Sequence, residues 1–138
     1  MKTDKTQYDL RWTDQVRKDA KKAGLSNDAQ AQIQVQIENL RGWADPEIRK
    51  LMDIKQLKGP YRRLFEVRLK GSTLGRANIR VFFAVFTKAR LVVVLGLIKK
   101  ETERGLDYVY ETMLDRLENV AREIETAKPE QKAREAKQ

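Results

Sequence analysis

The chain has 138 residues, 41% of them hydrophobic and 36% charged, with a formal net charge of +9, which corresponds to one folded domain with a highly charged surface. It contains neither cysteine nor histidine, which excludes disulfides, thiolate metal sites and the commonest general base. No apolar run approaches the roughly 20 residues that cross a bilayer, and residues 1–10 lack the apolar segment of a secretory signal, so we expect a cytoplasmic protein.

The chain begins with a predicted strand and two helices. Residues 8–12 alternate apolar and polar side chains, which is typical of a strand. A helix is predicted from Thr13 or Asp14 to about Ala23, and Gly24 is a natural stop for it.

Ser26 and Asn27 are candidate caps of a second helix, whose apolar face is formed by Ile33, Ile37 and Leu40. Residues 43–60 are expected to be irregular, apart from one short helix near 47–52.

Three strands and a long helix are predicted in the second half. The strands are expected at 64–70, 78–86 and 91–98, with a hairpin loop at 71–75 and a tight turn around Lys88 and Ala89. A helix with an apolar stripe follows from 101 to 127, and the charged residues 128–138 are expected to form a frayed tail. These elements predict a single α+β domain over residues 1–127: a small antiparallel sheet, built from the N-terminal strand and a three-strand meander, with its helices covering one face.

The positive charge is concentrated in the middle of the chain. Residues 49–100 carry fourteen Lys and Arg against two acidic residues, whereas residues 1–48 carry eight of each and residues 101–138 carry seven basic and ten acidic residues. A basic segment between neutral or acidic flanks favours a polyanion as the partner. The alternative is a basic surface that only aids solubility.

Strand periodicity brings several of these cations to one face. Arg68 and Lys70 are two residues apart, and Arg80 alternates with apolar neighbours on the next strand, so all three would project from the sheet face opposite the core. Arg76 could reach the rim of this face, and one of Lys99 and Lys100 must point to it. Such a patch could bind a phosphate backbone. It could also stabilise the charge of a phosphodiester under attack by its own 2′-hydroxyl, with a lysine as the general base.

Aromatic side chains near the patch could stack on RNA bases, and the candidates are Phe82, Tyr61, Tyr108 and Tyr110. Arg62 and Arg63 are further candidates for RNA binding. The acidic residues of the last helix lie at helical spacing and are better explained as a solvated face than as metal ligands, so no metal site and no cofactor are predicted.

Four motifs occur in order: LKG at 57–59, LFEVR at 64–68, IRVFF at 79–83 and VLGLIKK at 94–100. Together they resemble the RelE/HigB superfamily of bacterial toxins, most closely its phage-derived, HigB-like branch. The resemblance implies a RelE/ParE-like fold and a metal-independent endoribonuclease that cuts mRNA on the ribosome and inhibits translation. It also implies neutralisation by a cognate helix-turn-helix antitoxin.

Carried over by position, the resemblance assigns catalytic roles to Arg68, Arg80 and the pair Lys99 and Lys100, and Lys70 is added from the shared face. The sequence departs from the family pattern after Lys100, where it reads Glu101-Thr102-Glu103. This departure motivates a second hypothesis: a non-catalytic protein of the same fold that inhibits gyrase or only binds RNA or a partner.

Overall fold

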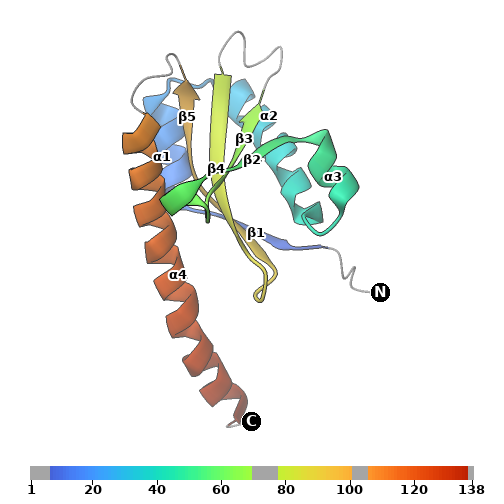
Figure 1. Ribbon diagram of the computed structural model, residues 1–138, viewed down its shortest axis with the longest axis vertical. Helices are drawn as coiled ribbons and strands as arrows, with labels where there is room; N and C mark the ends of the chain where they lie inside the picture. The colour runs from blue at the N-terminus through green and yellow to red at the C-terminus, as the bar shows by residue number, and fades with distance from the viewer. Residues whose placement is uncertain (1–6, 70–77, 101–105, 137–138) are drawn as a thin grey trace.

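The computed structural model describes residues 7–69, 78–100 and 106–136, and for residues 78, 100 and 127–136 only the backbone. In these ranges, one strand is followed by three α-helices, then by four strands and a long C-terminal helix (Figure 1). The strands are β1 (Asp9–Trp12), β2 (Asp53–Gln56), β3 (Phe65–Leu69), β4 (Asn78–Phe86) and β5 (Leu91–Lys100). The helices are α1 (Asp14–Lys22), α2 (Asn27–Glu38), α3 (Pro46–Leu51) and α4 (Leu106–Ala136).

The helix boundaries follow local chemistry in the N-terminal half. Gly24 has a φ of 69°, the left-handed conformation that ends α1 as predicted. The Ser26 hydroxyl accepts a hydrogen bond from the Ala29 N–H at 3.1 Å and caps α2. The Asp45 carboxylate caps the short helix α3 in the same way.

The five strands form one mixed sheet in the order β1-β5-β4-β3-β2. The meander β3-β4-β5 is antiparallel as predicted, but β1 pairs with β5 in parallel, so the prediction of a wholly antiparallel sheet is wrong. The edge strand β2 is also absent from the sequence-based prediction. Its four residues are mostly exposed and charged, so they carry no apolar alternation.

Both faces of the sheet are packed, which corrects the expectation of one open face. On one face, α1 and α2 bury a core that includes Val67, Ile79, Val81 and Phe83. On the other face, α4 packs its own apolar stripe against Phe82 and other sheet residues: Leu64, Ala84, Val93 and Leu95. Surfaces on this α4 face are therefore exposed only where the helix does not cover them.

The helix α4 lies along one side of the sheet and extends past it towards the C-terminus (Figure 1). It continues to Ala136, beyond the predicted end at residue 127. No helix in the described ranges combines the length and apolar character needed to span a membrane.

Candidate functional site

Two arginines face each other across neighbouring strands on the α4 face. In the antiparallel register, Arg68 of β3 lies opposite Arg80 of β4, and Glu66 lies opposite Phe82. Directly opposed residues project to the same side of a sheet, so the predicted shared face of Arg68 and Arg80 is confirmed. The next strand continues the row, because Arg80 also pairs with Ile98 of β5.

A buried carboxylate lies between the two arginines. Glu66 is only 1% exposed, and its Oε1 lies 3.4 Å from Arg80 Nη1 and 3.7 Å from Arg68 Nε. Arg80 is itself 6% exposed, whereas 41% of the Arg68 side chain reaches solvent. The expectation that Arg80 projects from an open sheet face is therefore wrong: it is a buried cation paired with Glu66. We name Glu66, Arg68 and Arg80 the arginine–glutamate cluster.

Two tyrosine rings lie beside this cluster, Tyr110 from the first turns of α4 and Tyr61 from the turn before β3. The ring of Tyr110 packs edge-on against Phe82 with centroids 6.0 Å apart, and it contacts the Tyr61 ring at 5.4 Å. Burial raises the pKa of the Tyr110 hydroxyl and the charge of Glu66 raises it further, whereas Arg80 acts in the opposite direction. The hydroxyl of Tyr110 therefore stays protonated at neutral pH.

Tyr61 fastens the turn before β3 to α4. Its hydroxyl donates a hydrogen bond of 2.6 Å to Glu111 Oε1. This bond is the main reason why the pKa of Tyr61 is raised to about 12. Tyr61 is thus engaged with α4 and is partly exposed, so it could reach a base only at the edge of the site.

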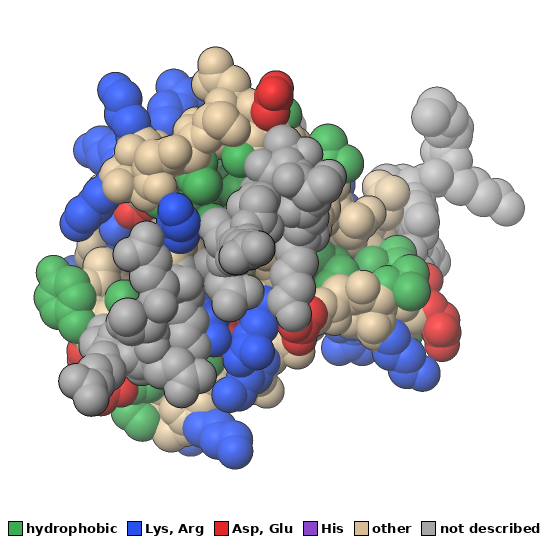
Figure 2. Space-filling view, turned by 90° about the horizontal axis from the view of Figure 1, so that it is seen from above, with side chains coloured by type: hydrophobic (Ala, Val, Ile, Leu, Met, Phe, Trp, Pro, Cys, Tyr) green, Lys and Arg blue, Asp and Glu red, His purple; other side chains and the backbone are tan. Residues whose placement is uncertain are grey.

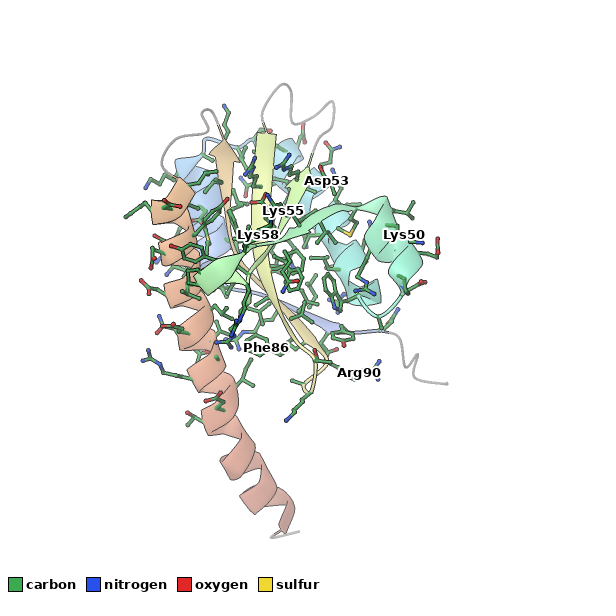
Figure 3. All side chains as sticks on the ribbon, in the orientation of Figure 1. Lys50, Asp53, Lys55, Lys58, Phe86 and Arg90 are labelled. Carbon is green, nitrogen blue, oxygen red and sulfur yellow. The ribbon has the colours of Figure 1, made fainter. Side chains whose placement is uncertain are left out.

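Further exposed cations come from β2 and the turn that follows it. Lys55 is the register partner of Glu66, which places it on the same face of the sheet. Lys58, Arg62 and Arg63 are also exposed. In Figure 3, Asp53, Lys55 and Lys58 follow one another along the segment that passes in front of β4. Lys55 is not among the site residues that the sequence predicts, because no local pattern predicts the strand β2 that positions it.

Arg62 and Arg63 border a hollow of 340 Å³. Its other lining residues include Gln56 and Phe86, and the Gln56 side chain donates a hydrogen bond of 2.7 Å to the Arg62 carbonyl. Two guanidinium groups beside an aromatic ring are suited to a nucleotide, because the cations contact phosphate and the ring can stack.

The other predicted site residues are placed differently. Phe82 is completely buried beneath Tyr110, so the prediction that it lies among exposed cations and stacks on a base is wrong. Lys99 is opposite Ile79, whose side chain is in the core beneath α1 and α2, so it shares that face and not the face of Arg80. Lys70, Arg76 and the side chain of Lys100 lie outside the described residues.

The distribution of charge is therefore more mixed than the sequence predicts. In the view from above, Lys and Arg side chains lie in several groups between polar and hydrophobic side chains (Figure 2). Three acidic side chains raise the pKa values of the two tyrosines of the site: Glu66, Asp107 and Glu111. Within the described ranges, no three acidic side chains are grouped so that they could hold a metal ion.

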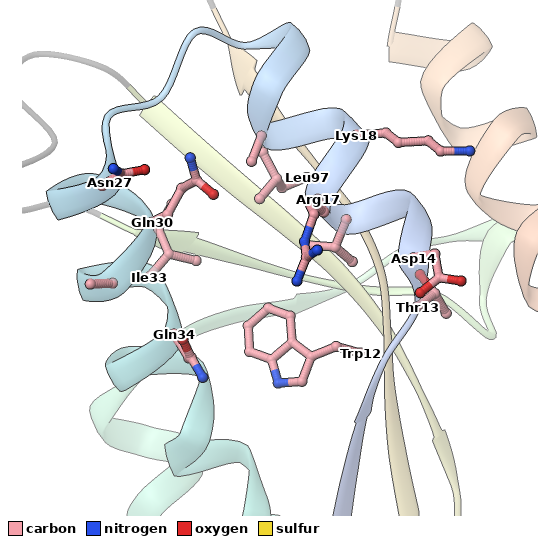
Figure 4. A pocket seen from close by; sticks show the side chains of 13 residues that line it. Trp12, Thr13, Asp14, Arg17, Lys18, Asn27, Gln30, Ile33, Gln34 and Leu97 are labelled. Atoms are coloured by element: carbon pink, nitrogen blue, oxygen red, sulfur yellow. The ribbon is translucent and has the colours of Figure 1, made fainter.

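A second, larger cleft lies between α1 and α2, with a volume of 760 Å³ (Figure 4). Its floor includes Ile33 and Leu97, and Arg17, Gln30 and Gln34 are at its sides. It is on the face of the sheet opposite the arginine–glutamate cluster.

This mixed sheet, with two N-terminal helices on one face and a C-terminal helix beside a pair of arginines on the other, has the fold of the RelE toxins. A double mutant of Escherichia coli toxin RelE in the free state is 17% identical and has a TM-score of 0.53, covering 80% of this chain and 97% of that chain. The fold that the sequence motifs imply is thereby confirmed, while membership of the HigB-like branch stays a prediction.

Two toxin–antitoxin complexes are similar at lower scores. RelBE2 from Mycobacterium tuberculosis is 20% identical with a TM-score of 0.49, covering 68% of this chain and 99% of that chain. The intact E. coli RelBE complex is 17% identical with a TM-score of 0.46, covering 69% of this chain and 99% of that chain. No protein-family model and no curated protein matches the sequence. Identities this low establish the fold and not the activity.

Proposed function

We propose that this protein is the toxin of a type II toxin–antitoxin system and that it cleaves mRNA on the ribosome in the cytoplasm. The observation that supports this best is the arginine–glutamate cluster, which places Arg68 and Arg80 side by side on the α4 face of a RelE fold. Two guanidinium groups in this arrangement can stabilise the charge that develops on a phosphodiester during cleavage.

The proposed reaction is an attack by the 2′-hydroxyl of the RNA on the adjacent phosphorus. A base takes the proton of the 2′-hydroxyl, a bond forms between O2′ and phosphorus, and the bond to O5′ breaks and leaves a 2′,3′-cyclic phosphate. Arg68 and Arg80 stabilise the pentacoordinate phosphate. Lys55 is on the same face and is a candidate for the base when deprotonated, as are Lys70 and Lys100 from the sequence.

Tyr110 is a candidate for the general acid that assists departure of the leaving oxygen, O5′. Its hydroxyl is protonated at neutral pH and packs close to the cluster, so it can donate a hydrogen bond or a proton to O5′. Arg62 and Arg63 would hold the neighbouring backbone phosphates beside their hollow.

Induced expression tests the proposal. The parent chain should arrest growth and cut translated messengers, as primer extension would show, and the double variant Arg68→Ala/Arg80→Ala should relieve both effects. Lys22→Ala on α1 is a matched control, because it removes one exposed cation from the other side of the molecule and should stay toxic. If the arginine double variant is as toxic as the parent, this site is wrong.

The same experiment separates the non-catalytic alternative, which the acidic surroundings of the arginines favour. Growth arrest without cleavage of messengers, together with inhibition of DNA supercoiling by purified protein, would identify a gyrase inhibitor. Cleavage within codons would identify the ribonuclease. We further propose that a cognate helix-turn-helix antitoxin neutralises the protein. It would compete with RNA for the cationic surface formed by five exposed side chains: Lys55, Lys58, Arg62, Arg63 and Arg68.

A further inference from the structure

The acidic member of the arginine–glutamate cluster has no role in the proposed cleavage, although it is the most deeply buried charge in the described part of the chain. Glu66 is 1% exposed, and both its carboxylate oxygens lie near Arg80 Nη1, at 3.4 and 3.5 Å. Arg68 approaches the same carboxylate, and Lys55 is opposite it on β2. Glu66 is therefore surrounded by cations on both neighbouring strands.

The fold does not need a carboxylate at this position. Burying a charge costs free energy of desolvation, and apolar residues of similar volume often replace buried ion pairs without loss of stability. The neighbouring positions on this face, Phe82 and Leu64, are apolar and completely buried. A charge at position 66 is thus better explained by its effect on the arginines than by packing.

That effect is to hold two flexible side chains in place. A free arginine side chain has about 2 kcal/mol of rotamer entropy, which must be lost before it can contact a phosphate in a defined geometry. Glu66 restrains one nitrogen of each guanidinium, while Arg80 Nε remains buried without a hydrogen-bond partner among the described residues. The cluster therefore holds its arginines, while 41% of the Arg68 side chain remains accessible to a second anion.

The charges of the cluster also match a phosphodiester. Two arginines and one glutamate together carry a net charge of +1, which balances the single negative charge of one backbone phosphate. We propose that Glu66 is a positioning residue: it holds Arg68 and Arg80 for the scissile phosphate, and its own negative charge weakens the binding of the RNA ground state. This inference rests on the proposed function and assigns the one charged residue of the cluster that the function did not use.

Substitution of Glu66 should therefore change binding and turnover in opposite directions. Glu66→Gln removes the charge at nearly constant size, so RNA should bind about fivefold more tightly, the effect of one unit charge at contact distance in a water-like dielectric. The less restrained arginines should lower the turnover number about tenfold or more, because small displacements of catalytic groups are costly. KM and kcat should both fall.

The measurement is RNA cleavage in a ribosome-dependent assay, together with binding of a single-stranded RNA that carries a 2′-deoxy group at the scissile position. Glu118→Gln is the matched control, because it makes the same change of charge at an exposed position of α4 and should leave KM and kcat unchanged. Glu66→Asp keeps the charge and should retain parental affinity with reduced turnover, and it also serves as the test if Glu66→Gln fails to fold.

The outcomes distinguish this inference from the function on which it rests. If Arg68→Ala changes neither RNA binding nor toxicity, the proposed function is wrong, and the role of Glu66 with it. If Arg68→Ala abolishes cleavage but Glu66→Gln lowers kcat without tighter binding, Glu66 is only structural. If Glu66→Gln behaves like Glu118→Gln, the positioning role is likewise overturned.

Discussion

Arg68 and Arg80 are opposite each other in the sheet, but water reaches them to very different extents. Arg80 is 6% exposed and shares a buried ion pair with Glu66, whereas Arg68 is partly exposed. The same type of side chain in the same cross-strand row can thus contribute differently to stability and to binding, because the desolvation of its charge differs.

Removing the two arginines should therefore have unequal effects on stability. Arg80→Ala leaves Glu66 buried without its nearest cation, and we expect the free energy of unfolding to fall by about 3–5 kcal/mol. Arg68→Ala removes a solvent-screened partner and should cost at most about 1 kcal/mol. Urea unfolding of both variants measures the difference, and equal losses would contradict the burial seen here. Arg68→Ala is consequently the cleaner test of function.

The contact between Tyr61 and Glu111 predicts an unusual titration. A tyrosine hydroxyl ordinarily has a pKa of about 10, and the hydrogen bond to Glu111 raises the pKa of Tyr61 to about 12. Glu111→Gln removes the charged acceptor and should return this pKa towards 10. The difference between the ultraviolet titrations of the parent and Tyr61→Phe isolates the residue.

The raised pKa of Tyr61 determines how its contribution to the free energy of unfolding changes with pH. The folded state holds the phenolic proton more tightly than the unfolded state, so the contribution of Tyr61 is complete below pH 10 and is lost as the pH rises through about 12. Tyr61→Phe should not show this loss. An alkaline stability profile that is identical for parent and variant would contradict the hydrogen bond.

At the scale of elements, the edge of β5 shows how the helices are held to the sheet. The strand β1 pairs only with residues 91–94, so beyond them the backbone of β5 has no strand neighbour on that side among the described residues. Side chains take its place: Asp19 Oδ2 accepts a bond from the Leu97 N–H at 3.1 Å, and Arg116 Nη1 donates to the Leu95 carbonyl at 3.1 Å. Asp19 and Arg116 also bind each other at 2.6 Å, which links α1 to α4.

Gly96 makes room for this link. A Cβ atom there would meet the side chains of Arg116, Asp19 and Met113, so only glycine lets the ion pair cross the strand. The requirement for glycine at this position is steric, because its backbone is not in a left-handed conformation.

Asp19→Ala should therefore destabilise the molecule well beyond an ordinary surface substitution. It leaves the Leu97 N–H without its acceptor and the partly buried Arg116 guanidinium without its carboxylate partner, and we expect the free energy of unfolding to fall by about 2–3 kcal/mol. Asp115→Ala on the exposed side of α4 is the control and should change stability by about 0.5 kcal/mol or less. Thermal unfolding with matched buffers would measure both, and equal shifts would contradict a role for the link.

At the scale of the whole molecule, α4 covers part of one sheet face, and the cationic surface lies beside the helix. Polar contacts hold the helix at several points along its length, among them Glu111 with Tyr61, Arg116 with Asp19, and Glu123 with Arg11 at 2.8 Å. The exposed cations lie beside it, on β2, β3 and the turn between them. RNA bound to the cationic surface would therefore run alongside α4.

The dependence of RNA affinity on salt should report this surface. Five exposed cations, Lys55, Lys58, Arg62, Arg63 and Arg68, would give a slope of about −3.5 in log K against log salt for single-stranded RNA. Removing any one of them should reduce the slope by about 0.7, whereas Lys22→Ala or deletion of residues 128–138 should leave it unchanged. A slope near zero would show that these cations only keep the protein soluble.

Local patterns in the sequence determined most of the secondary structure. Alternation identified β1 and β3, β-branched and aromatic content identified β4, and a continuous apolar run identified β5. The capping residues and Gly24 bounded the first two helices, and all these signals depend only on neighbouring residues. The shared face of Arg68 and Arg80 followed in the same way from the period of two residues along each strand, whereas their direct opposition in the register is seen only in the structure.

Long-range contacts decided the rest. The short, charged strand β2 forms because β3 offers it a partner, and Lys55 joins the site only through that pairing. The packing of α4 on the second sheet face buries Phe82 and Arg80. The apolar run of β5 is typical of a strand covered on both faces, but it does not specify which distant element covers it. The sequence by itself therefore determined four of the five strands, the first helices and the shared face of the arginines. Burial, ion pairing and the neighbours of that face were decided by tertiary structure, because they depend on which distant element covers each side chain.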